Sequence, residues 1–362
     1  MLKLAVSSLP AAVVGLLLKD LPETLLRSLP LQAATYKIHW YLGHKNLDYF
    51  EDAALEFKKA VETGSHGDIS VDIVLQADDQ PASAAGQGSE IAAMVAKGDA
   101  EMGHSFTDVM GGLDHRLYAY NAPYLFRGYR HMEAVFEGPL GSEMLEGLRA
   151  HGLLGLSFTY SGGANGIATT GRALRRPEDL KGLKVGVFGS EVDRAWLDSL
   201  GATAVPLEHR REDILPAARS GALDGVVVTW RNFQQATLDS DFKYVSLMSA
   251  TYLVSVTYIN ERFFDSLPKE YRALITKASR EAGRLERART IQLNETAKVD
   301  LLGRGVRAVH LTQENRDRFV KALQPAYAGP IERVIGKDLV ERIRKTGDAP
   351  AHPGIPSEFA QR

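Results

Sequence analysis

The chain has 362 residues, of which 44% are hydrophobic and 24% are charged, enough apolar material for two folded domains. Its formal net charge of −2, with acidic and basic residues interleaved, excludes a strong electrostatic attraction to nucleic acid or to an anionic membrane. It contains no cysteine, which excludes disulfides, thiolate nucleophiles and zinc–thiolate sites and suits an oxidising compartment.

Residues 1–34 resemble a signal for export. A basic start precedes an apolar run at residues 4–18, which is too short to span a membrane. A second apolar stretch at residues 25–31 ends before the small pair Ala33 and Ala34, where we expect cleavage. A misassigned start codon or an amphipathic N-terminal helix would also explain these residues. Together with the features below, the segment predicts an exported protein.

From Tyr36 onward, short β-type runs alternate with helical patterns, which is typical of an α/β fold with mostly parallel sheets. In the first series we expect strands at residues 36–42, 69–75, 100–106 and 153–160 and helices at 49–62 and 91–96. In the second series we expect strands at residues 183–188, 203–205 and 223–229 and helices at 191–200 and 211–220. Between the two series lies Ser161-Gly162-Gly163, whose glycines suit a hinge or a crossover.

The last third of the chain is expected to connect the two series. Residues 252–259 are β-branched and aromatic, so we expect a strand that carries the chain back toward the first lobe. Pro268 begins a helical pattern that reaches about residue 302, on the order of 50 Å and long enough to brace two lobes. A further helical region at residues 313–345 precedes a proline-containing tail.

These elements predict two lobes, each discontinuous in sequence. The first lobe takes residues 35–160 plus about 252–290, and the second takes residues 161–251 plus about 291–345. Residues 346–362 are expected to form a flexible tail.

Charged residues on the long helix alternate in sign, which predicts a solvated helix face and not a basic patch. They are Arg280, Arg284, Arg287 and Arg289, interleaved with Glu270, Glu281 and Glu286.

The sequence shows no catalytic constellation. It contains no Gly-x-Ser-x-Gly, His-Glu-x-x-His or phosphate-binding loop, and the glycine-rich segment after residue 160 lacks the dinucleotide fingerprint. The spacing of His104, His115 and His131 matches no common ligand pattern, and turn chemistry explains Asp78 and Asp79. We therefore expect no catalytic residue, no metal and no cofactor.

Ordered sequence blocks extend over most of the chain, from about residue 36 to residue 345. They are Tyr120-Asn121-Ala122-Pro123-Tyr124-Leu125-Phe126-Arg127-Gly128-Tyr129, Pro177-Glu178-Asp179-Leu180-Lys181-Gly182-Leu183-Lys184-Val185, Gly189-Ser190, Leu200-Gly201-Ala202, Gly221-Ala222-Leu223-Asp224-Gly225 and Phe264-Asp265-Ser266-Leu267-Pro268-Lys269-Glu270-Tyr271. In these blocks the chain resembles the substrate-binding subunits of tripartite ATP-independent periplasmic (TRAP) transporters, of the dicarboxylate-receptor (DctP) type.

The resemblance implies a two-lobed periplasmic-binding-protein fold of the α/β class, with a hinge and a long C-terminal brace helix. It implies a periplasmic receptor, not an enzyme, whose lobes close on a small organic molecule, expected to be an organic acid or a related polar metabolite. The implied partners are the TRAP membrane subunits, with no role for nucleic acid. One alternative is a receptor that signals to a membrane partner, and another is a hydrolase or dehydrogenase built on the same lobes.

Two positions depart from the pattern that the resemblance implies. The strand after Lys-Gly-Leu-Lys usually carries an arginine that binds the ligand carboxylate, and this chain has Gly186 there. A second arginine usually follows the preceding strand, and this chain has Asn165. The polar edge expected after Asp224-Gly225 is replaced by the mostly apolar residues 226–229. Because a buried carboxylate without a cation costs on the order of several kcal/mol, the ligand is expected to be atypical or held by another cation.

Loops at the carboxyl ends of strands line the cleft of open α/β sheets, and this rule selects the ligand-binding candidates. Arg231 is the first candidate for a compensating cation, ahead of Lys45 and Arg194. The polar candidates are Asn165 and Thr229, followed by Ser105, Ser190 and Asn232. The aromatic candidates, each equally suited to a core position, are Trp40, Phe106, Phe188, Trp230 and Tyr252. Gly186 would make room for a bulkier ligand or relax a site that is organised elsewhere.

Overall fold

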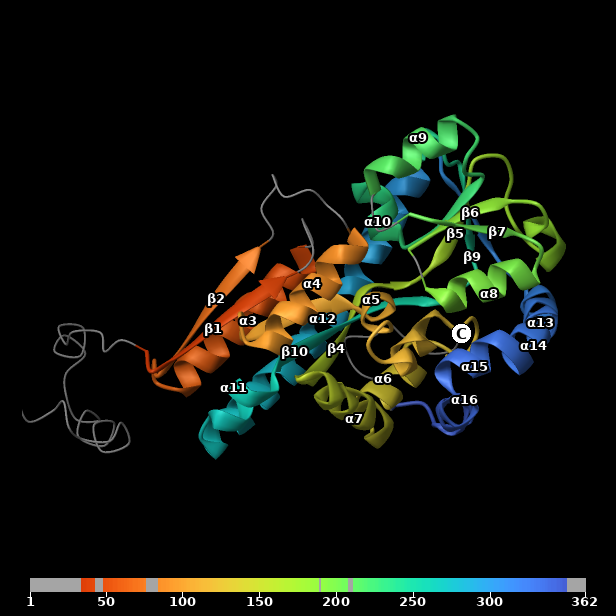
Figure 1. Cartoon of the computed structure of the whole chain (residues 1–362). Helices are drawn as coiled ribbons and strands as arrows, with labels where there is room; N and C mark the ends of the chain where they lie inside the picture. Colours follow the sequence, from red (N-terminus) through yellow and green to blue (C-terminus); the bar gives the residue numbers. More distant parts are fainter. Residues whose placement is uncertain (1–33, 43–47, 76–83, 189, 208–210, 350–362) are drawn as a thin grey trace, which may run out of the picture.

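Two β-sheets, each covered by helices, form the body of the protein (Figure 1). The computed structural model describes residues 34–42, 48–75, 84–188, 190–207 and 211–349. The expectations for the export segment, for Lys45 and for Asp78 and Asp79 lie outside the described residues. None of the helices within these ranges is long and apolar enough to cross a membrane.

The first sheet has five strands in the order β2-β1-β3-β10-β4. Strands β1, β2 and β3 are parallel, and β10 runs antiparallel to both of its neighbours. Strands β3, β10 and β4 are almost entirely buried, because helices cover both faces of the sheet. The strands are β1 Tyr36–Leu42, β2 Ile69–Leu75, β3 Met102–Phe106, β4 Leu153–Ala164 and β10 Tyr252–Asn260. The helices of this part are α3 Asp48–Gly64, α4 Ala84–Lys97, α5 Thr107–Met110, η2 His115–Asn121, α6 Tyr129–Phe136, α7 Pro139–Glu146, η3 Gly147–His151 and α11 Glu261–Ser266.

The second sheet has six strands in the order β11-β9-β5-β8-β6-β7. They are β5 Gly166–Thr169, β6 Lys184–Val187, β7 Thr203–Pro206, β8 Gly225–Val228, β9 Tyr244–Leu247 and β11 Arg307–His310. The helices of this part are η4 Pro177–Leu180, α8 Glu191–Ser199, η5 Arg211–Asp213, α9 Ile214–Arg219, α10 Trp230–Gln235 and η6 Leu238–Ser240. The sequence analysis did not predict the short strands β5, β9 and β11.

A two-stranded ribbon carries the chain between the sheets. Strand β4 continues past Tyr160, where the sequence predicted its end, and stays paired with β10 as far as Ala164. Asn165 then joins β4 to β5, and its backbone N–H donates to the carbonyl of Thr251 at 2.9 Å. The predicted crossover is therefore present, as one strand whose register with β10 shifts between Thr159 and Gly163.

The glycines of this ribbon are required by both backbone shape and space. Gly162 and Gly163 have φ values of 148° and 70°, in the region that favours glycine. A Cβ atom on Gly163 would lie 2.5 Å from Oη of Tyr129, and one on Gly162 would lie 2.9 Å from Oγ1 of Thr229. Any larger residue would push apart the helices that pack on the ribbon.

Helix α12, Lys269–Gly303, braces both sheets as the sequence predicted. Near its N-terminus Ile275 and Ala282 pack in the core of the first sheet. Near its C-terminus Ala297 and Leu301 pack in the core of the second sheet.

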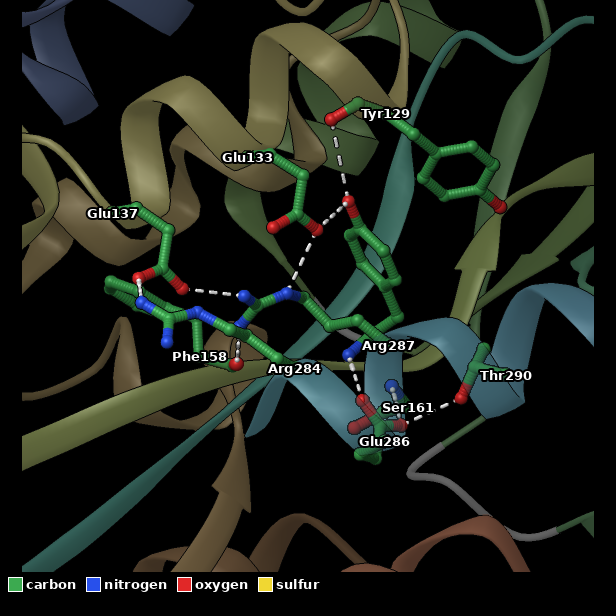
Figure 2. Close-up of polar contacts among 10 residues, drawn as sticks. Tyr129, Glu133, Glu137, Phe158, Ser161, Arg284, Glu286, Arg287 and Thr290 are labelled. Atoms are coloured by element: carbon green, nitrogen blue, oxygen red, sulfur yellow. Dashed lines mark hydrogen bonds and ion pairs between the residues drawn. The ribbon is translucent and has the colours of Figure 1, made fainter. Parts of the chain in front are cut away.

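The prediction of a solvated face is wrong for Glu286 and Arg287, whose exposed fractions are 0% and 2%. The Glu286 carboxylate accepts hydrogen bonds from the backbone N–H groups of Tyr160 and Ser161, at 2.7 and 3.1 Å, and from Oγ1 of Thr290 at 2.7 Å (Figure 2). Burial raises the pKa of Glu286 to about 7, and these donors oppose the rise. The helix thus supplies the acceptor for two buried donors of the ribbon.

Arg287 ties the same strand to helix α6. Its guanidinium donates to the carbonyl of Phe158 at 2.7 Å, to Glu133 at 2.8 Å and to Glu137 at 2.5 Å (Figure 2). Asn294, two turns further along α12, donates to the carbonyl of Gly162 at 2.9 Å. The brace is therefore a set of directed bonds to the ribbon and not only an apolar contact.

The predicted helical region at residues 313–345 is broken into short pieces that contact both lobes. Pro325 and Pro330 interrupt it, because proline cannot donate within a helix. Oη of Tyr327 donates to the carbonyl of Pro123 at 2.6 Å in the first lobe. The pieces are α13 Gln313–Ala322, α14 Gln324–Ala326, the π-helical turn η7 Tyr327–Ile331, α15 Glu332–Ile335 and α16 Lys337–Lys345.

Residues 346–349, expected as the start of a flexible tail, are held against α6. Arg127 donates to the carbonyl of Thr346 and Arg130 donates to that of Ala349, both at 2.8 Å.

The Glu286→Ala substitution is expected to lower the free energy of unfolding by about 3 kcal/mol or more, because it leaves two buried backbone N–H groups without an acceptor. Urea denaturation followed by circular dichroism measures the change. Glu281→Ala, on the exposed face of the same helix, is the matched control and should change stability by less than about 0.5 kcal/mol. Equal effects of the two substitutions would contradict the role given to Glu286.

Candidate functional site

A small cavity lies between the two sheets, at the carboxyl ends of the parallel strands β6 and β8. It has about 20 Å³ of free volume. Its apolar wall is formed by Val187, Phe188, Val227, Val228 and Leu253. Its polar groups are Asp108, Asn121, Asn165, Asp193, Thr229 and Asn232. Because side chains from both lobes line it, a molecule bound there would be enclosed when the lobes come together.

A wider depression runs along the outer face of α12, from Phe264 to Arg284, and among the described residues only α11 and α12 line it. A one-sided depression cannot enclose a solute, so the cavity between the sheets is the candidate site. No group of three or more His, Asp or Glu side chains suited to a metal ion gathers in the described part of the chain.

Asp193 enters the cavity from the first turn of α8. Ser190 caps this helix, and its Oγ accepts the backbone N–H of Asp193 at 2.9 Å. The Asp193 carboxylate accepts hydrogen bonds from Nδ2 of Asn121 at 3.0 Å and from Nε1 of Trp196 at 3.1 Å. Burial raises the pKa of Asp193 to about 7, the bond from Trp196 opposes the rise, and the carboxylate of Asp108 adds to it.

Asp108 faces Asp193 from the other lobe. It lies in α5, directly after strand β3, and its carboxylate accepts the backbone N–H of Val109 at 2.8 Å. Burial also raises the pKa of Asp108 to about 7.

Asn165 and Thr229 line the cavity, and hydrogen bonds fix both side chains. Nδ2 of Asn165 donates to Oγ1 of Thr251 at 3.0 Å, which fixes its amide on the ribbon. Thr229 caps α10, and its hydroxyl accepts the backbone N–H of Asn232 at 3.4 Å.

The structure brings together part of the predicted site. The cavity is lined by Asn165, Phe188, Thr229 and Asn232. Ser190 does not line it, but its Oγ accepts a hydrogen bond from Asp193, which does.

The remaining polar and aromatic candidates lie in the cores or at helix ends and do not line this cavity. Ser105 shares a hydrogen bond of 2.7 Å with Oη of Tyr258. The other candidates are Trp40 packed on Phe57, Trp230 on Phe233, Tyr252 on Tyr129 and Phe126, and Phe106 at the start of α5.

Gly186 is buried in β6 and faces away from the cavity. A Cβ atom at this position would lie 2.6 Å from Cδ1 of Leu207, whereas the next residue, Val187, lines the cavity. Successive side chains of a strand point to opposite faces, so a side chain at position 186 would enter the core of the second lobe.

Neither described cation candidate lines the cavity. The backbone N–H of Arg231 donates to Asn294 at 3.0 Å, and its guanidinium donates to Gln234 at 2.7 Å, beside α12. Arg194 is exposed on α8. That Arg231 replaces a family arginine therefore stays a prediction.

Sequence reasoning missed Asp108, Asn121 and Asp193. The signal for Asp193 was the helix start that follows Ser190, where an acidic residue is typical of the first turn. Asp108 comes two residues after a predicted strand end, and Asn121 lies in a block already noted for its resemblance to the family.

Comparisons with known proteins agree with this architecture. The family described as bacterial extracellular solute-binding protein, family 7 (DctP), matches residues 43–333, which is more than half of the chain. A solute-binding protein of Verminephrobacter eiseniae is 29% identical over 62% of this chain and 65% of its own length. The C4-dicarboxylate-binding periplasmic protein DctP of Rhodobacter capsulatus is 27% identical over 62% of this chain and 66% of its own length. The chain thus aligns with slightly less than two thirds of these relatives.

Solved structures share the fold. A TRAP periplasmic solute-binding protein of Roseobacter denitrificans with bound β-D-glucuronate has a TM-score of 0.76, with 18% identity over 86% of this chain and 100% of its own. The sugar acid binding protein of Advenella mimigardefordensis in complex with galactonate has a TM-score of 0.75, with 22% identity over 87% of this chain and 98% of its own. The α/β fold, the two lobes and the long C-terminal helix predicted from the sequence are confirmed. The chain belongs to the DctP family, the bacterial extracellular solute-binding proteins of family 7.

Proposed function

We propose that the chain is an extracytoplasmic solute receptor, which binds a small organic molecule between its lobes and delivers it to a TRAP-type membrane permease. The observation that carries the proposal is the cavity at the carboxyl ends of β6 and β8, lined from both lobes. Family membership supports it, because the relatives are solute-binding proteins by name. The periplasm is the compartment in which such a receptor works, and residues 1–34 would direct it there.

Binding is proposed to act by closing the lobes. The ribbon of β4 and β10 and the helix α12 connect the lobes beside the cavity, so a change in their twist would open or close it. A ligand that contacts both walls stabilises the closed arrangement by the difference between its affinities for the two states.

Chemical conversion of the ligand is not part of the proposal. The hydroxyls nearest the cavity, those of Ser190 and Thr229, serve as helix caps. Neither has a described histidine beside it, as an activated nucleophile requires. The arrangement supports capture and release.

Ligand binding should stabilise the folded protein. We expect at least one member of a panel containing glucuronate, galactonate, succinate, amino acids and neutral polyols to raise Tm by about 5 °C when present well above its Kd. Differential scanning fluorimetry of residues 35–362 measures the shift. If natively folded protein responds to no compound of the panel, the receptor proposal fails.

The Asn165→Ala substitution should raise the Kd of the panel member that binds most tightly by about tenfold. The reason is that it removes an amide that lines the cavity. Isothermal titration calorimetry measures the Kd. Gln292→Ala, which removes an exposed amide on α12, is the control and should leave the Kd unchanged. An unchanged Kd in Asn165→Ala would place the ligand elsewhere.

A further inference from the structure

One acceptor in the cavity has no partner within the described protein. Asn121 exposes only 6% of its surface, and while its Nδ2 donates to Asp193, its Oδ1 accepts no hydrogen bond. A buried carbonyl oxygen without a donor costs about 1–3 kcal/mol. Because Asn121 lines the cavity, this oxygen calls for a donor from a ligand or water.

Two carboxylates face the same space from opposite lobes. Asp193 already accepts from Trp196 and Asn121, but two carboxylate oxygens offer about four acceptor positions, so capacity remains. Asp108 lies near enough to raise the pKa of Asp193. The other titratable groups described beside the pair are Glu191 on α8 and Tyr118 on η2, neither of which carries a positive charge.

The charge of the site decides which ligand group fits. Among the described residues that line the cavity there is no lysine, arginine or histidine. A ligand carboxylate placed there would add a further negative charge to two acids in a buried site, whereas a cation would relieve their repulsion.

The free volume sets the size of that group. About 20 Å³ accommodates one water-sized group, and an ammonium group is of this size.

We propose that the cavity formed by Asp108, Asn121 and Asp193 is a subsite for a protonated amine of the ligand. The ammonium N–H groups donate to Oδ1 of Asn121 and to the two carboxylates, joining the first lobe to the second. The ligand class is therefore a small organic molecule that bears a primary amine. This inference rests on the receptor function proposed above and specifies its substrate.

Binding of an amine is expected to depend on pH, because the carboxyl groups of Asp108 and Asp193 lose protons when it binds. Burial raises the pKa of both carboxyls to about 7, so the empty site retains part of its protons near neutral pH. A bound ammonium favours the ionised carboxylates and releases up to one proton from each. For each proton released, affinity for an amine should rise about tenfold between pH 6 and pH 8, while affinity for an uncharged analogue should stay constant.

Matched probes that differ only in the amine test the proposal. The pairs are L-alanine and L-lactate, putrescine and 1,4-butanediol, and glucosaminate and gluconate, each titrated by calorimetry at pH 8 into residues 35–362. We expect the amine of at least one pair to bind about tenfold or more tightly than its partner. In two buffers of different ionisation enthalpy near pH 7, the wild-type protein should release protons as that amine binds.

Isosteric variants test the roles of Asp108 and Asp193 in the preference for an amine. Asp193→Asn and Asp108→Asn should each reduce the preference for the amine to less than about threefold, and Asp198→Asn, exposed on the same helix as Asp193, should retain it. The proton-release measurement needs no variant and keeps the test valid if Asp193→Asn does not fold.

The outcomes separate the two proposals. If the hydroxyl partners or plain acids bind at least as tightly as the amines, with no proton release, the amine subsite is wrong while the receptor function stands. If neither the amines nor any other compound of the panel binds natively folded protein, the receptor function itself is wrong.

Discussion

The carboxylate of Glu286 is the contact on which the arrangement of the lobes depends. It accepts two backbone N–H groups at the point where β4 passes from the first sheet toward the second. These donors are buried, so only an acceptor from the neighbouring helix can satisfy them, and α12 brings one because both ends of the helix are fixed in different cores. The next residue, Arg287, binds the carbonyl of Phe158 in the same strand, so helix and ribbon move together.

The position of the candidate site follows from this constraint. With the ribbon held at Ser161 and Gly162, Asn165 falls at the junction of the two sheets, beside Thr229 at the end of β8. The opposite wall comes from the first lobe, where the turn after β3 presents Asp108. The cavity therefore depends on how the two lobes are placed relative to each other. A receptor that closes on its ligand requires a site of this kind.

The sequence predicted what depends on local pattern. Strands β1 and β2 begin and end where expected, because polar turns on either side of an apolar run define the ends of a strand. Helix α12 was predicted because its helical pattern is long. Glu286 was assigned to a solvated face because helical periodicity does not show which groups lie opposite a charge. Asn165 and Thr229 were found from strand ends, whereas Asp108 and Asn121 come from short helices whose approach to α8 depends on how the lobes pack.

Ligand capture is proposed to close the two lobes, which the ribbon and α12 join. The chain has no cysteine, so Glu90→Cys on α4 and Asp198→Cys on α8 would place one spin label on each lobe, both at exposed positions. Double electron–electron resonance with and without the strongest binder of the panel measures the distance between them. If the ligand closes the lobes, the distribution of distances between the two spin labels should narrow to a single population when ligand is present. A distribution left unchanged by saturating ligand would contradict the account.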